Sequence, residues 1–220
     1  MTRSSCFRLC ACLALSLTAL ACGSSNSNPG MSSWDKARIG NTGTKWWINA
    51  IKGAYFFSNM IGPSYECEAD GQTEVIDFTK AVTAKLTSGS PDPLTLLPAS
   101  GEVAGWAYGV DDISNATVQP QKATTQKAAT DLIDGGADPF FTSSYSATAF
   151  AWEVYQKDAD TLLDARVWQM SSAADASSLF AGLLSNSLYS PDNIPWKTCT
   201  GTACPAPAPT SDPNKCWTVH

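Results

Sequence analysis

The chain of 220 residues contains a single histidine, His220, which is its last residue. A Ser-His-Asp triad, a Cys-His dyad or a histidine-based zinc site would need this terminal residue at its centre, and terminal residues are poorly fixed. The sequence also has neither a Walker phosphate loop nor a G-x-G-x-x-G loop. These observations argue against nucleophilic, zinc and nucleotide chemistry. We therefore predict no catalytic residue and no cofactor.

The stretch DLIDGGADPFF, residues 131–141, looks most like a motif. Asp131, Asp134 and Asp138 could together supply oxygen ligands to Ca²⁺. However, the alternating Asp/Asn positions closed by a distant Glu that define a calcium loop are absent. The alternative is that these carboxylates are solvated or cap a helix, while the glycines permit close packing. We predict no metal site and retain Asp134 and Asp138 as candidate ligand-binding residues.

Paired carboxylates offer the remaining enzymatic alternative. Asp111 and Asp112 are adjacent, but neighbouring side chains rarely converge on one substrate. A retaining glycosidase needs two carboxylates about 5 Å apart, and the 20 acidic residues include no pair that the sequence singles out. An envelope hydrolase using such a pair is therefore the alternative to a binding or structural role.

Aromatic residues suggest a binding chemistry. Exposed tryptophans could stack on sugars or peptides, with Trp46, Trp106 and Trp152 as candidates. Packing of these rings in the core is the commoner use of tryptophan, and we favour it here.

Residues 1–21 have the composition of a signal peptide. The first eight carry two arginines and no acid, and residues 9–21 form an apolar run of 13. This run is too short to span a bilayer comfortably and suits the central region of a signal peptide. Ala19-Leu20-Ala21 fits the small-x-small pattern of ordinary secretory cleavage.

The same three residues followed by Cys22 resemble the lipobox of bacterial lipoproteins, in which a small residue precedes the Cys that becomes the lipid-modified N-terminus. The resemblance implies a lipid anchor on Cys22. Gly23 stands where Asp commonly signals inner-membrane retention, so the resemblance favours an outer-membrane lipoprotein facing the periplasm or the cell surface. Residues 22–33, which include GSSNSNPG, are predicted to be a flexible tether.

The number of cysteines supports this interpretation. Removal of the leader leaves an odd set, Cys22, Cys67, Cys199, Cys204 and Cys216. If Cys22 carries lipid, the other four can pair in an oxidising compartment. We predict structural disulfides, with Cys199–Cys204 as a local bond that leaves Cys67 for Cys216. The other two pairings remain open, because sequence alone does not choose between them.

The charge distribution restricts the partners. The formal net charge is −6, and no cluster of Lys and Arg occurs anywhere in the chain. Nucleic-acid binding through contacts with the backbone phosphates therefore has no electrostatic basis. We predict attachment to the membrane through the N-terminal lipid, no nucleic-acid partner, and a protein or small-molecule ligand whose identity is unknown.

The hydrophobic pattern predicts a mixture of helices and strands. We expect a mostly buried helix over 44–61, helices over 73–89 and 121–136, and two strands, 147–156 and 161–170, that form an antiparallel hairpin. Ser172 and Asp175 have capping-box spacing at the start of a further helix. The prolines after residue 190 exclude long regular elements.

These elements predict an α+β fold with a small antiparallel sheet packed with several helices. The single domain is expected over 34–190, followed by a Pro-rich tail, 191–220, that disulfides pin to it.

The middle of the chain also resembles an uncharacterised family of exported bacterial proteins. The features are Leu96–Pro98, Gly105-Trp106, the Asp-Gly-Gly-Ala stretch within 131–138, two strands, and a segment from Trp168 to Phe180 that enters a helix. The resemblance covers roughly Leu94 to Ser190 and implies an α+β domain outside the inner membrane with no assigned activity. We therefore expect a lipid-anchored cell-envelope protein with a binding or structural role.

Overall fold

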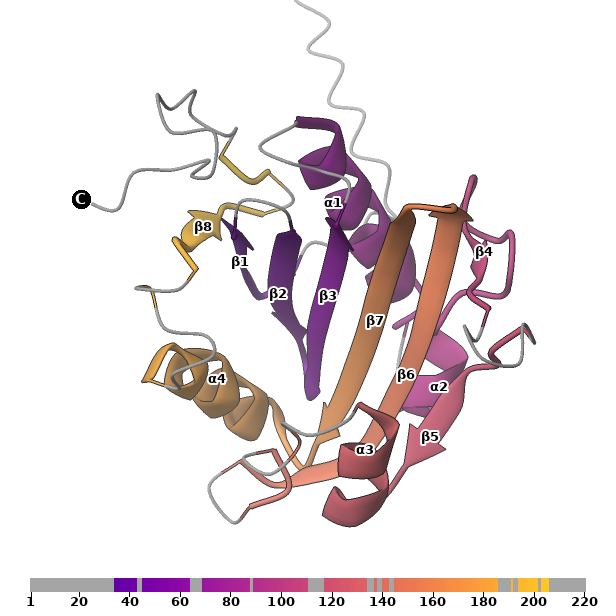
Figure 1. Cartoon of the computed structure of the whole chain (residues 1–220). Coiled ribbons are helices and arrows are strands. Elements are labelled where there is room, and N and C mark those ends of the chain that lie inside the picture. Colours follow the sequence, from indigo (N-terminus) through magenta and orange to yellow (C-terminus); the bar gives the residue numbers. More distant parts are fainter. Residues whose placement is uncertain are drawn as a thin grey trace, which may run out of the picture.

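The computed structural model shows one antiparallel sheet with helices on both of its faces (Figure 1). It describes residues 34–42, 45–63, 69–87, 89–110, 117–133, 137, 140–142, 145–185, 191, 194–201 and 203–205. Within these residues the sheet has eight strands in the order β4-β6-β7-β3-β2-β1-β8, with β5 also paired to β6. The α+β class is therefore confirmed, but the prediction of a small sheet was wrong.

The elements follow one another along the chain as β1 (Lys36–Asn41), β2 (Trp46–Lys52), β3 (Tyr55–Pro63), α1 (Ala69–Ala84), α2 (Pro93–Leu96), β4 (Ala107–Tyr108), β5 (Gln121–Ala123), α3 (Gln126–Leu132), β6 (Ala147–Asp158), β7 (Thr161–Met170), α4 (Ala173–Gly182), the 3₁₀ turn η1 (Leu183–Ser185) and β8 (Lys197–Cys199). Two local hairpins, β2–β3 and β6–β7, meet at the centre of the sheet, where β3 pairs with β7.

The segment 44–61, for which we predicted a buried helix, forms the hairpin β2–β3 instead. Gly53 begins its two-residue loop with a φ of 55°, a conformation that glycine adopts without steric cost. The prediction failed because both faces of these strands are buried: Ile48 on one face and Ile51 on the other are almost fully enclosed. A strand that is apolar on both faces loses its period of two and cannot be told from a buried helix by periodicity.

Three of the other predictions are confirmed. Helix α1 covers most of the predicted segment 73–89, although it begins four residues earlier and ends at Ala84. Strands β6 and β7 form the predicted antiparallel hairpin. Helix α4 begins as predicted, because Ser172 Oγ accepts a hydrogen bond from the Asp175 N–H at 3.1 Å. The segment 121–136 differs in part, since its first residues form strand β5 and only the later ones form α3.

Helices α1 and α2 cover one face of the sheet, which we call the α1 face (Figure 1). Its core contains large side chains from the strands and from α1, including Trp46, Phe57, Phe78 and Tyr155. The Phe78 and Tyr155 rings pack edge to face with centroids 4.8 Å apart, a favoured geometry for aromatic pairs.

Helix α4 and the region of α3 lie on the opposite face, which we call the α4 face (Figure 1). Trp168 of β7 is at the centre of its core. The rings of Phe140 and Phe150 stack against it, each with its centroid 4.0 Å from that of Trp168. The sheet is therefore covered on both faces, as is typical of a layered fold.

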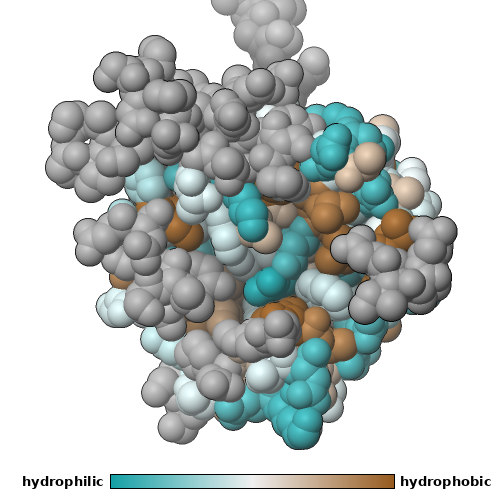
Figure 2. All heavy atoms as spheres, in the orientation of Figure 1, coloured by the Kyte–Doolittle hydropathy of each residue, from teal (hydrophilic) through white to brown (hydrophobic). Residues whose placement is uncertain are grey.

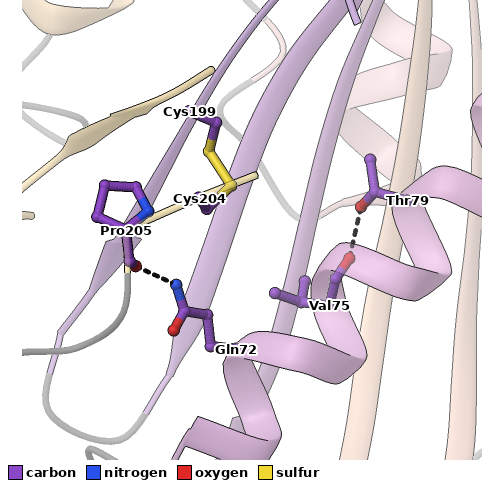
Figure 3. The surroundings of a disulfide bond; sticks show 6 residues. All are labelled: Gln72, Val75, Thr79, Cys199, Cys204 and Pro205. Atoms are coloured by element: carbon purple, nitrogen blue, oxygen red, sulfur yellow. Dashed lines mark hydrogen bonds between the residues drawn. A yellow bond between two sulfur atoms is a disulfide. The ribbon is translucent and has the colours of Figure 1, made fainter. Parts of the chain in front are cut away.

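The segment after α4 returns to the sheet and extends it. Strand β8 pairs antiparallel with β1, and the disulfide Cys199–Cys204 closes the chain directly after it. Gln72 of α1 donates a hydrogen bond to the Pro205 carbonyl at 2.5 Å (Figure 3). The start of the Pro-rich tail is therefore attached to the domain by strand pairing and by a contact with α1, whereas the disulfide closes a loop within the tail itself.

Candidate binding site on the α4 face of the sheet

A row of polar side chains crosses the α4 face from strand to strand. Arg38 of β1 is opposite Asn49 of β2, which is opposite Ser58 of β3, which is opposite Arg166 of β7, which is opposite Trp152 of β6. Directly opposed residues of antiparallel strands project from the same face, with their Cβ atoms about 5 Å apart. We call these five residues the polar row.

At one end of the polar row, two aromatic rings enclose the guanidinium of Arg38. Its Cζ lies 4.4 Å from the Phe180 ring centroid and 5.0 Å from that of Trp196. These distances are within the range of cation–π attraction. Because Phe180 belongs to α4 and Trp196 precedes β8, this contact ties the helix and the C-terminal segment to the sheet, and Arg38 is only 4% exposed.

Asn49 is the unusual member of the polar row. Its side chain is fully buried, yet neither its amide oxygen nor its amide nitrogen has a hydrogen-bond partner among the described residues. A buried polar group without a partner costs about 1–3 kcal/mol, and such groups are rare enough to need an explanation. The indole N–H of Trp152 is likewise buried and has no partner in the part of the chain that the structure describes. Two members of one row thus have unused hydrogen-bonding capacity.

Arg166 and Asp164 of β7 form an ion pair in the middle of this face. Arg166 Nε lies 2.8 Å from Asp164 Oδ1, and Arg166 Nη2 lies 2.5 Å from Asp164 Oδ2. This two-pronged geometry is the strong form of an Arg–carboxylate pair. The two side chains are 21% and 16% exposed, so the pair is accessible from solvent and places balanced charges there.

A second row next to the polar row is only half-buried. Trp47, Met60, Asp164 and Val154 are opposed in register, each two residues from a member of the polar row on the same strand, and we call them the open row. Beyond it, Leu162 is 41% exposed. Figure 2 shows a hydrophilic strip across the middle of this side of the molecule, with hydrophobic atoms on both sides. The two rows together form a surface that combines polar groups with apolar ones.

One buried acid lies on the opposite side of the sheet. Glu153 of β6 projects from the α1 face, where its side chain is fully buried. Burial raises its pKa to about 7, opposed by a hydrogen bond from the Val154 N–H. Its charge contributes to the raised pKa of the neighbouring Tyr155 phenol, for which burial is the main cause. The Glu153 carboxyl therefore has no exposed surface in this structure, and it lies on the face of the sheet opposite the polar row.

The structure describes some of the residues that the sequence singled out. Cys199 and Cys204 are disulfide-bonded, as predicted. Cys22, Cys67, Cys216, Asp134 and Asp138 lie outside the described residues.

The remaining candidates occupy different environments. Asp131 is exposed and forms an ion pair with Lys127 one helical turn away. Trp46 and Trp106 are core residues, as favoured above, whereas Trp152 is half-buried in the polar row. Among the described residues no group of three His, Cys, Asp or Glu could hold a metal ion. In the same part of the chain, no helix is long and apolar enough to cross a membrane.

No protein-family model, curated protein or solved structure matches this chain. The candidate site therefore depends on geometry alone. Sequence reasoning missed Asn49, Ser58 and Arg166 as a group, because their proximity depends on pairing between distant strands. The available signal was a polar residue at the centre of each apolar strand, which is a costly place for it.

Proposed function

We propose that this protein is a lipid-anchored component of the bacterial cell envelope that binds a ligand on the α4 face. Two features support a location in the cell envelope: the lipobox-like sequence at Cys22 and the disulfide Cys199–Cys204. Disulfides persist in oxidising compartments. The anchor would hold the domain at a membrane surface through the tether, with the membrane as its fixed partner.

The observation that supports the binding role is the buried amide of Asn49, which has no hydrogen-bond partner among the described residues. Natural domains are only marginally stable, so such a group in the central part of a sheet lowers the free energy of unfolding by an amount that matters. It lies beside a half-buried row that contains both apolar side chains and an accessible ion pair. Ligand-binding sites are typically lined by apolar side chains with a few placed polar groups.

Metabolic labelling with a fatty acid tests the anchor. The wild-type protein should incorporate label and the Cys22→Ala variant should not. Equal labelling of the two proteins would exclude lipid attachment at Cys22.

Site-specific photo-crosslinking in cells tests the binding face. A photoreactive residue at Leu162, beside the open row, should give a discrete adduct. The same residue at Val110, which is 42% exposed and lies outside both rows, is the matched control. Adducts from both positions, or from neither, would contradict a binding site on the α4 face.

A further inference from the structure

We infer that the α4 face binds a neutral oligosaccharide along the polar and open rows. This inference rests on the proposed binding function and gives its ligand a chemical class. Four features of the site support it: the unused hydrogen-bonding groups, the balanced charge, the flanking aromatic and apolar side chains, and the length of the row.

The unused groups of the polar row match hydroxyl chemistry. The Asn49 amide offers one acceptor and two N–H donors, all without partners, and Trp152 Nε1 offers one further donor. A hydroxyl donates one hydrogen bond and accepts others, so neighbouring hydroxyls of a sugar can satisfy both sides of an amide at once. Because Asn49 is fully buried, each such bond would remove a desolvation cost already present in the free protein.

The charges of the face favour a neutral ligand. Arg166 and Asp164 neutralise each other at its accessible centre, and Phe180 and Trp196 enclose the guanidinium of Arg38. An anionic ligand placed over the centre would lie against the Asp164 carboxylate, and a cationic one against Arg166. A polyhydroxylated neutral ligand can instead accept from the guanidinium and donate to the carboxylate without breaking their pair.

The flanking side chains fit the C–H faces of sugar rings. Trp47 lies two residues from Asn49 on the same face of β2, and Val154 is in the same relation to Trp152 on β6. Large aromatic and aliphatic groups therefore lie next to each of the two unused polar groups. Both Trp47 and Val154 are half-buried, so part of their surface is available for contact.

The length of the row favours an oligomer over a single sugar. Asn49 and Trp152 are separated by three strand spacings, or about 14 Å. Only a chain of linked rings reaches both groups. Since Asn49 has no exposed surface in the free protein, its engagement also requires movement of α4, the helix that packs against β2, and this movement can be measured.

The test uses the full-length protein and three neutral probes, cellotriose, chitotriose and maltotriose, with trigalacturonate as an acidic comparison. Binding is followed by titration calorimetry and by amide hydrogen exchange. At least one neutral probe should bind with a Kd below about 1 mM. It should also change amide exchange at the residues of α4. Absence of binding by all three neutral probes up to about 10 mM would overturn the inference.

Two variants and one control test the residues. Asn49→Leu should raise the Tm, because it removes two buried groups without partners, and it should weaken binding by about tenfold or more. Trp152→Phe keeps the ring and removes the N–H, so it should weaken binding by a smaller factor. Trp34→Phe removes an equally buried and unpartnered indole N–H from the α1-face core and should leave affinity unchanged.

The outcomes separate this inference from the proposed function. Wild-type affinity in Asn49→Leu would overturn the inference, as would binding of trigalacturonate alone. A specific crosslink at Leu162 without binding of any neutral probe would reject the sugar ligand and still support a binding face. Absence of both would reject the two proposals together.

Discussion

Gly40 of β1 lies directly against the side chain of Ile194, such that a Cβ added at Gly40 would be 2.3 Å from Ile194 Cγ2 and 3.1 Å from Trp196 Cε3. The C-terminal segment therefore packs on the first strand at a distance that only glycine permits. This contact, together with the Arg38–Trp196 contact, makes the segment before β8 part of the α4-face core.

Substitution of Gly40 should therefore release this segment. Gly40→Ala is expected to lower the free energy of unfolding by about 1–3 kcal/mol, the usual cost of overpacking, measured by urea denaturation. Ile194→Ala removes the atom that clashes, so Gly40→Ala should cost less in that background. Equal costs in both backgrounds would show that the two residues are not coupled.

Glu153 should make stability depend on pH. Its pKa is raised by burial from 4.5 to about 7 in the folded protein, so the folded state retains a proton that the unfolded chain loses. The stabilising contribution is complete below about pH 4.5 and is lost as the pH rises through about 7, by up to about 3 kcal/mol.

Glu153→Gln should remove this dependence, because the amide cannot ionise and its oxygen can still accept from the Val154 N–H. The measurement is the difference in unfolding free energy between wild type and variant at pH 5 and at pH 8. The variant should gain relative to wild type at the higher pH. Parallel curves across this range would mean that Glu153 does not titrate as its burial implies.

The Cys199–Cys204 disulfide should hold β8 on the sheet. Its sequence separation is 5, and closure of so short a loop contributes about 2 kcal/mol in the chain-entropy model. Replacement of both cysteines with serine should increase amide exchange at Ala37 and Ile39, which face β8. Exchange at the β6–β7 pair should stay close to wild type, and equal acceleration at both places would indicate global destabilisation instead.

The α4 N-cap provides a matched pair of serine substitutions. Ser172→Ala removes the hydrogen bond to the Asp175 N–H and should cost about 1 kcal/mol of unfolding free energy. Ser178 is exposed within the same helix, and alanine is the better helix former there. Ser178→Ala should therefore leave stability unchanged or slightly higher. A similar loss in both variants would show that the cap is not the cause.

The sequence was informative where signals are local. The β6–β7 hairpin could be predicted because its strands alternate and a short turn joins them, and α4 could be predicted because Ser172 and Asp175 have capping spacing.

The rest depends on contacts between distant residues. Strands β2 and β3 are apolar on both faces, so their pattern resembled a helix. The polar row brings together residues from five strands, and no short window of sequence contains more than one or two of them. The candidate site could not be predicted for this reason, although each polar residue was visible as an interruption in an apolar strand.

The central pairing of β3 with β7 also has a kinetic consequence. The hydrogen bond from the Arg166 N–H to Asn59 Oδ1 joins residues 107 positions apart. Strand β1 pairs with β8, which is almost the last described part of the chain. Sheets dominated by such distant pairings fold slowly. The sheet can therefore close only after the residues of β8 have been synthesised, and until then one edge of β1 has no neighbouring strand.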